Sequence, residues 1–189
     1  MRNLKTIAIA LLVTFSTAAV SAQTKKVDVS KSTINWVGKK VTGQHNGTVN
    51  LKEGALVFKG EKLTGGTFTV DMNSINTTDL KAGEGKEKLD GHLKNDDFFG
   101  TDKYPTSKLV FKTIKSKGNN VYTVTADVTI KAKTNPVTFD ITVKGNTATT
   151  SFAIDRAKYD IKYGSGSFFD NLGDKAINDN FDISVSLVF

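Results

Sequence analysis

Hydrophobic and polar residues alternate with a period of two in one segment of the chain after another. In residues 181–189, Phe, Ile, Val, Leu and Phe occupy every second position, with Asp and Ser at most of the positions between them. Residues 122–130 and 137–143 repeat the pattern, mainly with Thr and Asp on the polar side. Because successive side chains of a strand point to opposite faces, each segment predicts a strand with one apolar and one polar face.

Further segments rich in Thr, Val, Phe, Ile and Gly also predict strands, which brings the total to eight or nine. Turn-forming residues separate several of them, as at 117–120, 145–146 and 53–54. Short turns favour antiparallel pairing of neighbours, and so many one-sided strands avoid exposed edges by closing into a barrel. The further strands are expected at 33–41, 46–51, 55–60, 64–72, 107–116 and 147–155.

Two segments depart from the strand pattern. Residues 86–94 place Leu89 and Leu93 four positions apart among charged residues, which is typical of a short amphipathic helix laid over the barrel. Residues 164–178 contain three glycines and predict a long loop or partial cover. The predicted fold class is therefore all-β, an eight-stranded antiparallel barrel with a short helix and a long loop covering one end.

The first 22 residues have the layout of a cleaved secretory signal. Two basic residues precede an uncharged apolar run over 6–15, and small residues ending at Ala22 follow it. The apolar run is about half of the roughly 20 residues that a membrane-spanning helix needs. We expect cleavage before Gln23, which leaves residues 23–189 as one domain with a periplasmic or secreted location.

Charge and cysteine content exclude several classes of function. The chain has 26 basic and 19 acidic residues, and without the two basic residues of the signal the counts are 24 and 19, a net charge of +5. Both signs are interleaved, whereas a nucleic-acid-binding protein clusters its positive charge, so no nucleic-acid partner is predicted. The absence of cysteine excludes disulfides, a thiol nucleophile and thiolate metal sites. An apolar core must then supply the stability.

Residues suited to catalysis or metal binding do not form a recognisable motif. The only histidines are His45 and His92, and the aspartates within 96–102 follow His92 without the spacing of a metal site. Residues 164–167 read Gly-Ser-Gly-Ser, which is neither a nucleophile elbow nor a phosphate-binding loop. We therefore predict no catalytic residue, no metal site and no enzymatic activity. The twelve Phe residues are more informative, because two Phe pairs, 98–99 and 168–169, lie outside the predicted strands as candidate lips of an opening.

Several stretches of the sequence carry a resemblance to a known family. They are Asn76-Thr77, His92-Leu93-Lys94-Asn95-Asp96-Asp97-Phe98-Phe99, Lys103-Tyr104-Pro105-Thr106, Leu109-Val110-Phe111, Val128-Thr129-Ile130-Lys131, Thr134-Asn135-Pro136-Val137-Thr138-Phe139-Asp140, residues 156–161 and residues 164–175. In these stretches the chain resembles the YceI-like family of exported polyisoprenoid-binding proteins, and the resemblance covers nearly all of residues 27–189. The family implies a lipocalin-like barrel of eight antiparallel strands, with a helix near one end and a deep apolar tunnel that holds an isoprenoid chain.

The resemblance implies a non-enzymatic carrier with a polyprenyl or quinone-like lipid as its ligand, no other cofactor, and transient contact with a membrane surface. It leaves the oligomeric state open, a homodimer included. The expected tunnel wall consists of Trp36, Phe58, Phe68, Val70, Phe111, Val124, Val128, Phe139, Ile141, Phe152, Phe181 and Ile183. The expected mouth consists of His92, Asp96, Phe98, Phe99, Arg156, Tyr159, Phe168 and Phe169.

Two alternatives stay open at the level of sequence. A small outer-membrane β-barrel also begins with a signal peptide, but its apolar rows face outward, its strands need about 9–11 residues, and aromatic girdles mark both interfaces. An extracytoplasmic hydrolase would carry a nucleophile motif or a metal cluster. The direction in which the apolar rows face separates the first alternative from a lipid carrier.

Overall fold

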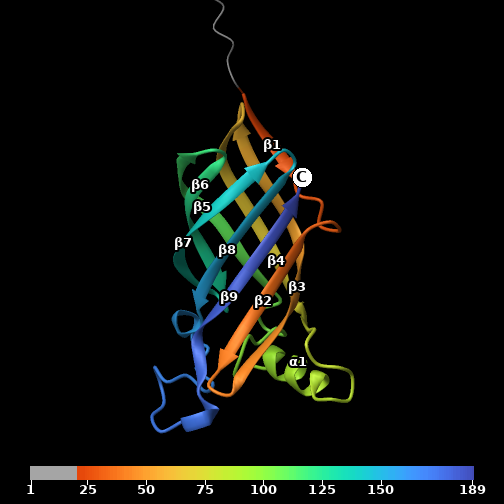
Figure 1. Ribbon diagram of the computed structural model, residues 1–189, viewed down its shortest axis with the longest axis vertical. Coiled ribbons are helices and arrows are strands. Elements are labelled where there is room, and N and C mark those ends of the chain that lie inside the picture. Colours follow the sequence, from red (N-terminus) through yellow and green to blue (C-terminus); the bar gives the residue numbers. More distant parts are fainter. Residues whose placement is uncertain (1–20) are drawn as a thin grey trace, which may run out of the picture.

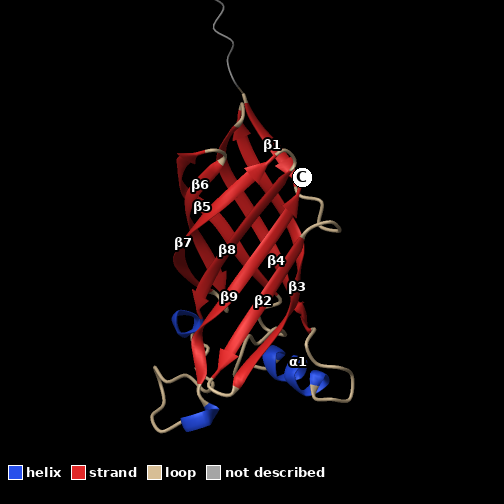
Figure 2. Cartoon of the chain, viewed as in Figure 1, coloured by secondary structure: helices blue, strands red, loops and turns tan. Residues whose placement is uncertain are grey.

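Nine strands, one α-helix and two short 3-10 helices make up residues 21–189, which the computed structural model describes (Figures 1 and 2). The signal peptide expected at residues 1–22 lies outside the described residues, except for Ser21 and Ala22. In chain order the elements are β1 (Ala22–Lys26), β2 (Thr33–Lys40), β3 (Gly43–Lys59), β4 (Lys62–Thr77), α1 (Lys86–Lys94), β5 (Thr106–Gly118), β6 (Val121–Ile130), β7 (Lys133–Lys144), β8 (Thr147–Asp155), η1 (Arg156–Tyr159), η2 (Gly173–Lys175) and β9 (Ile177–Val188).

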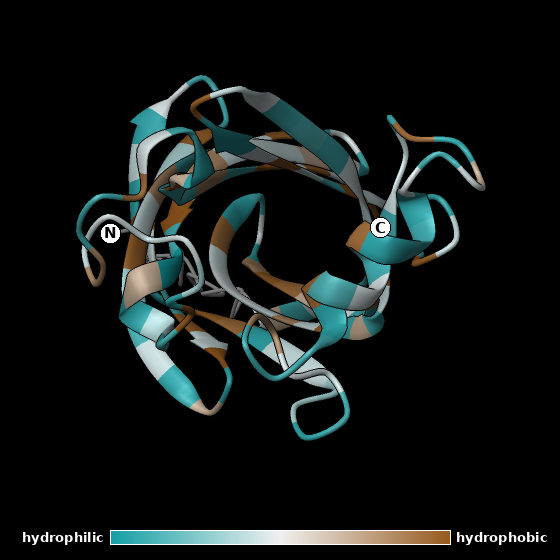
Figure 3. Cartoon of the chain, turned by 90° about the horizontal axis from the view of Figure 1, so that it is seen from below, coloured by the Kyte–Doolittle hydropathy of each residue, from teal (hydrophilic) through white to brown (hydrophobic). Residues whose placement is uncertain are grey.

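Strands β2 to β9 form a closed antiparallel barrel. Each strand pairs with the next along the chain, and β2 pairs with β9 to complete the ring. Figure 3 looks along the barrel and shows this ring of strands, with loops and short helices around its rim. Closure removes the two exposed edge strands that an open sheet would have, which is why strands with one apolar face favour it. The predicted eight-stranded barrel is confirmed, with β1 as an additional strand paired to β3.

The alternation in the sequence places apolar rows inside and polar rows outside. In β6, Tyr122, Val124, Ala126, Val128 and Ile130 are buried, and the residues between them are half-buried on the outer face. Threonines of β6 and β7 form cross-strand hydroxyl pairs on the exposed surface, with oxygen separations of 2.7 and 3.0 Å. Such pairs stabilise the outer face of neighbouring strands, so both faces of the sheet follow from the same period of two.

One predicted turn is wrong. Residues 46–51 and 55–60 were expected as two strands separated by Glu53-Gly54, but they belong to the single strand β3, whose register with β4 shifts between Leu51 and Glu53. A side chain at Gly54 would place its Cβ 2.7 Å from the Phe68 ring of β4. The glycine therefore makes room for a neighbouring ring within the strand, and the extra residue is absorbed as a β-bulge.

The elements outside the barrel agree with prediction except at the N-terminus. Helix α1 occupies the predicted residues 86–94, with Leu93 buried and Leu89 packed against the core. Residues 164–178 form a loop that contains η2, and the last two of them begin β9. Strand β1 was not predicted. It pairs with the second half of β3, where Ala22 lies opposite Lys59.

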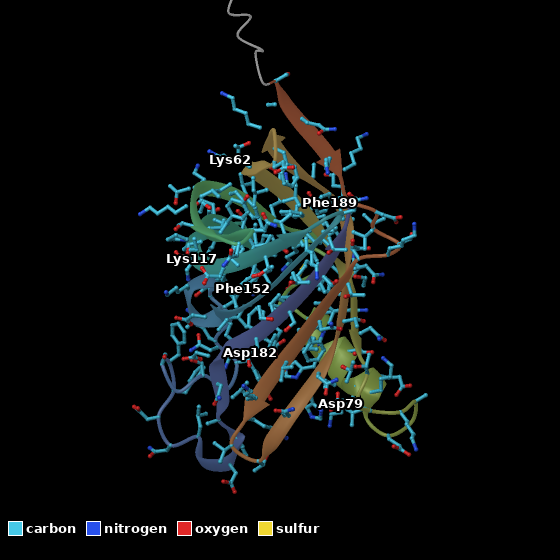
Figure 4. The ribbon with its side chains drawn as sticks, turned by 45° about the horizontal axis from the view of Figure 1, so that its top comes forward. Lys62, Asp79, Lys117, Phe152, Asp182 and Phe189 are labelled. Carbon is cyan, nitrogen blue, oxygen red and sulfur yellow. The ribbon has the colours of Figure 1, made fainter. Side chains whose placement is uncertain are left out.

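Side chains fill the interior at one end of the barrel, which we call the closed end. Leu56 and Phe58 lie near the β3–β4 turn, and Val124 lies near the β5–β6 turn; all three are fully or nearly fully buried. The Phe58 ring packs 5.6 Å from that of Phe189. Figure 4 labels Phe189 and Lys62 at this end. The opposite end carries α1, the β2–β3 turn and the β8–β9 loop, and we call it the open end (Figure 1).

Candidate functional site

An apolar cavity of about 190 Å³ occupies the barrel interior between the closed end and the open end. All eight barrel strands contribute lining residues, and so do α1, η1 and the segment that follows α1. The polar residues among them are few: Ser107, Lys108, Thr150, Arg156 and Asn178. A concave site of this composition, mostly apolar with a few polar groups, is typical of a small-molecule binding site.

Ten of the twelve residues expected in the tunnel wall line the cavity. They come from strands that are far apart in sequence, and their side chains belong to the inward-facing rows. The ten are Trp36, Phe68, Val70, Phe111, Val128, Phe139, Ile141, Phe152, Phe181 and Ile183.

The structure places the other two expected wall residues in the packed core. Phe58 is 4% exposed and Val124 is fully buried, and neither lines the cavity. Both lie in inward rows, so their periodicity is the same as that of the lining residues. Phe58 packs against Phe189 at the closed end, and Val124 is covered beside Phe139, its cross-strand neighbour, whose ring lines the cavity instead.

Four phenylalanine rings form a belt across the cavity wall. The ring centroids of Phe68 and Phe111 are 5.6 Å apart, those of Phe111 and Phe139 6.0 Å, and those of Phe139 and Phe152 4.5 Å. A Cβ at Gly66 would lie 2.7 Å from the Phe111 ring, so this ring packs directly on the backbone of β4 at Gly66. The belt gives the cavity a continuous aromatic wall contributed by β4, β5, β7 and β8.

The stacked pair of the belt lies where the wall loses its backbone pairing. Strands β7 and β8 pair only as far as Ile141 and Thr150. The rings of Phe139 and Phe152, two residues farther toward the open end on each strand, are nearly parallel, with an interplanar angle of 17°. Figure 4 labels Phe152 on β8. Ring stacking thus joins the two strands beyond their last backbone pair.

Gly38 leaves a gap in the inward row of β2. Ile34, Trp36 and Gly38 all line the cavity, but an ideal Cβ at Gly38 would meet no atom within 4 Å. Its cross-strand neighbour on β9 is Phe181, which also lines the cavity. A side chain is therefore missing from the wall near the open end, and the cavity retains its width there.

Arg156 is buried at the open end and is anchored by backbone carbonyls. Its Nη1 donates hydrogen bonds to the carbonyl oxygens of Ile161, at 3.0 Å, and Tyr163, at 2.8 Å. Its Nε donates to that of Asn178, at 3.1 Å, and its Nη2 to that of Ile177, at 3.0 Å. These bonds use four of the five N–H donors of the guanidinium. Arg156 therefore fastens the start of β9 to the chain after η1, and it shapes the mouth more than it offers donors to a ligand.

Asp179 partly balances the charge of Arg156. Its Oδ1 is buried, lies 3.5 Å from Arg156 Nη2 and has no hydrogen-bond partner, while its Oδ2 accepts a hydrogen bond from Ser167. Burial raises the pKa of Asp179, but the Ser165 and Ser167 hydroxyls and the Arg156 charge outweigh it, so the pKa lies below its ordinary value. Burial lowers the pKa of Arg156, and Asp179 opposes that shift. The guanidinium also lies 5.7 Å from the centre of the Phe98 ring.

The Phe98-Phe99 pair lines the open end of the cavity. The two ring centroids are 5.5 Å apart, and Phe99 meets Phe181 edge to face at 6.2 Å. His92 lies just outside the cavity lining, with its ring 5.6 Å from Phe98 and 4.4 Å from Tyr163. His92 thus connects α1 to the loop after η1.

The remaining expected mouth residues lie outside the cavity. Asp96 is exposed and pairs with Lys103, with 2.5 Å between the charged atoms. Tyr159 is 1% exposed, and its hydroxyl has no partner; burial raises its pKa to about 12. Phe168 and Phe169 are 43% and 51% exposed, so they flank the opening without lining the cavity.

Sequence reasoning missed about half of the cavity lining. Val185 and Leu187 continue the inward row of Phe181, so alternation alone would have found them. Leu93 enters from α1, and Ile177 lies at the boundary between loop and strand, where no period of two applies. The other lining residues that were not predicted are Ile34, Gly38, Val49, Met72, Ile75, Ser107, Lys108, Leu109, Ile130, Thr150, Ile154 and Asn178.

Within residues 21–189, no three His, Cys, Asp or Glu side chains lie together in a way that could hold a metal ion. No helix in the same part of the chain is long and apolar enough to cross a membrane.

Comparison with protein families matches residues 26–189 to the YceI-like domain. The chain belongs to the YceI-like family. A UPF0312 protein of Shewanella denitrificans is 34% identical over 92 residues, which are 49% of this chain and 46% of that protein. A UPF0312 protein of Staphylococcus aureus is 43% identical over 73 residues, 39% of this chain and 36% of that protein. The matched parts therefore span less than half the length of these curated relatives.

Solved structures with the same barrel come from several bacteria. Burkholderia cenocepacia BcnA superposes with a TM-score of 0.69 at 25% identity, over 86% of this chain and 99% of BcnA. A polyisoprenoid binding domain from Saccharophagus degradans, implicated in plant cell wall breakdown, gives a TM-score of 0.62 at 14% identity, over 89% of this chain and 97% of that domain. The likeness to the Saccharophagus domain concerns the fold, and it confirms the lipocalin-like barrel of the YceI-like chain.

Proposed function

We propose that this protein is a non-enzymatic lipid-binding protein that carries or sequesters a polyisoprenoid or quinone-like lipid in its barrel, in the periplasm or outside the cell. The observation that carries the proposal is the apolar cavity, whose wall is built from inward rows of Phe, Ile, Val and Leu. Membership of the YceI-like family and the fold shared with a polyisoprenoid binding domain support the same ligand class.

The size of the cavity fits a short piece of an isoprenoid chain. An apolar cavity of about 150 Å³ holds a benzene molecule, which has about six carbons to bury. By that measure a cavity of about 190 Å³ has room for on the order of eight carbons, or between one and two isoprene units. At about 0.8 kcal/mol for each carbon removed from water, the gross gain is roughly 6 kcal/mol.

A bilayer offers the same chain a similar gain, so the preference for the protein must come from the shape of the wall and from contacts at the mouth. The phenylalanine belt and the gap at Gly38 supply a wall of fixed shape. The polar end of the ligand then lies near Asn178 and the Phe98 ring, which are among the groups that line the open end.

The direction of the apolar rows favours this function over an outer-membrane barrel. The outer face of β6 and β7 carries mainly Thr, Asp and Lys, whereas a membrane barrel presents an apolar band to lipid. Fractionation of cells tests the difference. We expect release of the mature chain with soluble extracytoplasmic proteins, and retention in detergent-dependent membrane fractions would contradict the proposal.

Organic extraction of natively purified protein, followed by mass spectrometry, is the decisive experiment. We expect an isoprenoid lipid in the extract, at a stoichiometry that falls when the wall is disrupted. An extract without an apolar ligand, together with failure to bind added polyprenol, would refute lipid binding.

A further inference from the structure

Four large apolar side chains are exposed at the open end of the barrel. Val41 is 64% exposed, Tyr163 47%, Phe168 43% and Phe169 51%. Among residues 21–189, two other large apolar side chains are similarly exposed; they belong to the β1–β2 connection and to β5. Single exposed apolar residues are ordinary, but a group at one site marks an interaction surface. We call these four residues the aromatic rim.

Backbone hydrogen bonds hold the aromatic rim together. The amide of Ile177 donates to the carbonyl of Gly164, at 2.7 Å, which closes the loop that carries Phe168 and Phe169. Gly164 has φ of +62°, a conformation that favours glycine. The amide of Val41 donates to the carbonyl of Ala176, at 3.3 Å, so the β2–β3 turn is tied to the same loop. Figure 1 shows the loop extending beyond the strand ends.

The aromatic rim adjoins the cavity. Ile177, which closes the loop at Gly164, lines the cavity, and so does Phe181 four residues farther along β9. Arg156 fixes this junction through its bonds to the carbonyls of Tyr163 and Ile177. Hydrogen bonds therefore tie the segments that carry the rim to residues that line the cavity.

Lysines accompany the exposed rings. Lys162 Nζ lies 5.2 Å from the centre of the Phe168 ring and 3.0 Å from Asp160 Oδ1, and exposed Lys40 precedes Val41 in the β2–β3 turn. Aromatic side chains beside lysines are the combination that binds the interface of an anionic bilayer, where rings enter the headgroup region and ammonium groups meet phosphates.

We propose that the aromatic rim docks the open end of the barrel on the surface of an anionic phospholipid bilayer. An isoprenoid chain then passes from the bilayer into the cavity without crossing water. This inference rests on the proposed function for its purpose, but docking itself is measurable without any lipid in the cavity.

Flotation with vesicles tests the docking. The vesicles contain equal parts of phosphatidylethanolamine and phosphatidylglycerol, and the variants are the double substitution Phe168→Ser with Phe169→Ser and, as a matched control, Val29→Ser. A fully buried Phe changes a partition constant by more than about tenfold, so we expect the double variant to bind the vesicles at least about tenfold more weakly. Val29→Ser removes a comparably exposed apolar side chain, 42% exposed, away from the rim and should bind as the wild type does.

A second measurement separates docking from lipid binding. Protein is loaded with a fluorescent polyprenol either from detergent or from the same vesicles. We expect the double variant to load normally from detergent and slowly from vesicles. Equal vesicle binding by wild type and double variant overturns the docking proposal, and so does equal weakening by Val29→Ser. Loss of self-association in the double variant, with no vesicle binding by the wild type, assigns the rim to a second copy of the chain. Failure of the wild type to load even from detergent instead refutes the proposed function.

Discussion

Replacing Gly38 by leucine is expected to narrow the cavity without unfolding the barrel. The position has no atom within 4 Å of an added Cβ, and its backbone needs no glycine-specific conformation. A leucine side chain brings four carbons into the cavity and displaces about one isoprene unit. At about 0.8 kcal/mol for each methylene, the lipid loses about 3 kcal/mol of binding free energy, or on the order of a hundredfold in affinity.

Stability should respond in the opposite direction. Glycine in a strand is unfavourable by roughly 0.5–1 kcal/mol relative to alanine, and the new side chain also covers apolar wall. We therefore expect an unchanged or slightly higher melting temperature, measured by circular dichroism. Affinity is measured by titration with a fluorescent polyprenol.

The matched control for this test is Gly91→Leu. Gly91 is an exposed helix position where an added Cβ also meets nothing within 4 Å, and it does not line the cavity. The control should bind polyprenol as the wild type does. Wild-type affinity in the folded Gly38→Leu variant would refute the assignment of this part of the cavity to the ligand.

Three further substitutions test the wall, the anchor and the helix. Phe139→Asp should lower both lipid retention in extracts and the free energy of unfolding, by at least about 3–5 kcal/mol, because a buried ring is lost and a carboxyl enters the wall. Arg156→Met should cost about 3–5 kcal/mol in denaturant unfolding, because buried carbonyls lose their donor. Asp90→Asn should reduce the amount by which the free energy of unfolding falls as the solution is made acidic. Burial raises the pKa of Asp90, but hydrogen bonds from Lys86 and Thr77 outweigh it and hold the pKa below its usual range. A lowered pKa in the folded state contributes stability above pH of about 4 that is lost as pH falls through the folded pKa.

Each of these tests has an outcome that contradicts it. Thr138→Asp changes the exposed residue next to Phe139 and should leave lipid retention intact; an equal loss would show that the effect is not specific to the wall. Lys158→Met removes a neighbouring exposed charge, and stability losses equal to those of Arg156→Met would contradict the anchoring role. An unchanged pH profile for Asp90→Asn would show that its bonds to α1 and β4 do not contribute to folding.

Some errors in the sequence-based prediction have identifiable tertiary causes. Glu53-Gly54 has the composition of a turn, yet it lies within β3 because Phe68 of the neighbouring strand needs the space that Gly54 leaves. Arg156 lines the open end of the cavity, as expected, but no sequence pattern indicated that its donors bind the carbonyls of residues 161, 163, 177 and 178. In both cases the partner is brought to the residue only by folding.

The sequence by itself determined the features that depend on near neighbours along the chain. The period of two fixed which rows face inward in β6 and β9, and the spacing of Leu89 and Leu93 located α1. The tertiary structure alone decided where the interior is filled and where it is open. Phe58 and Phe139 occupy equivalent places in their local patterns, yet only Phe139 lines the cavity. The free volume at any level of the barrel depends on the combined volume of the side chains that eight strands bring together across the axis. The period of two within one strand carries no information about that combined volume.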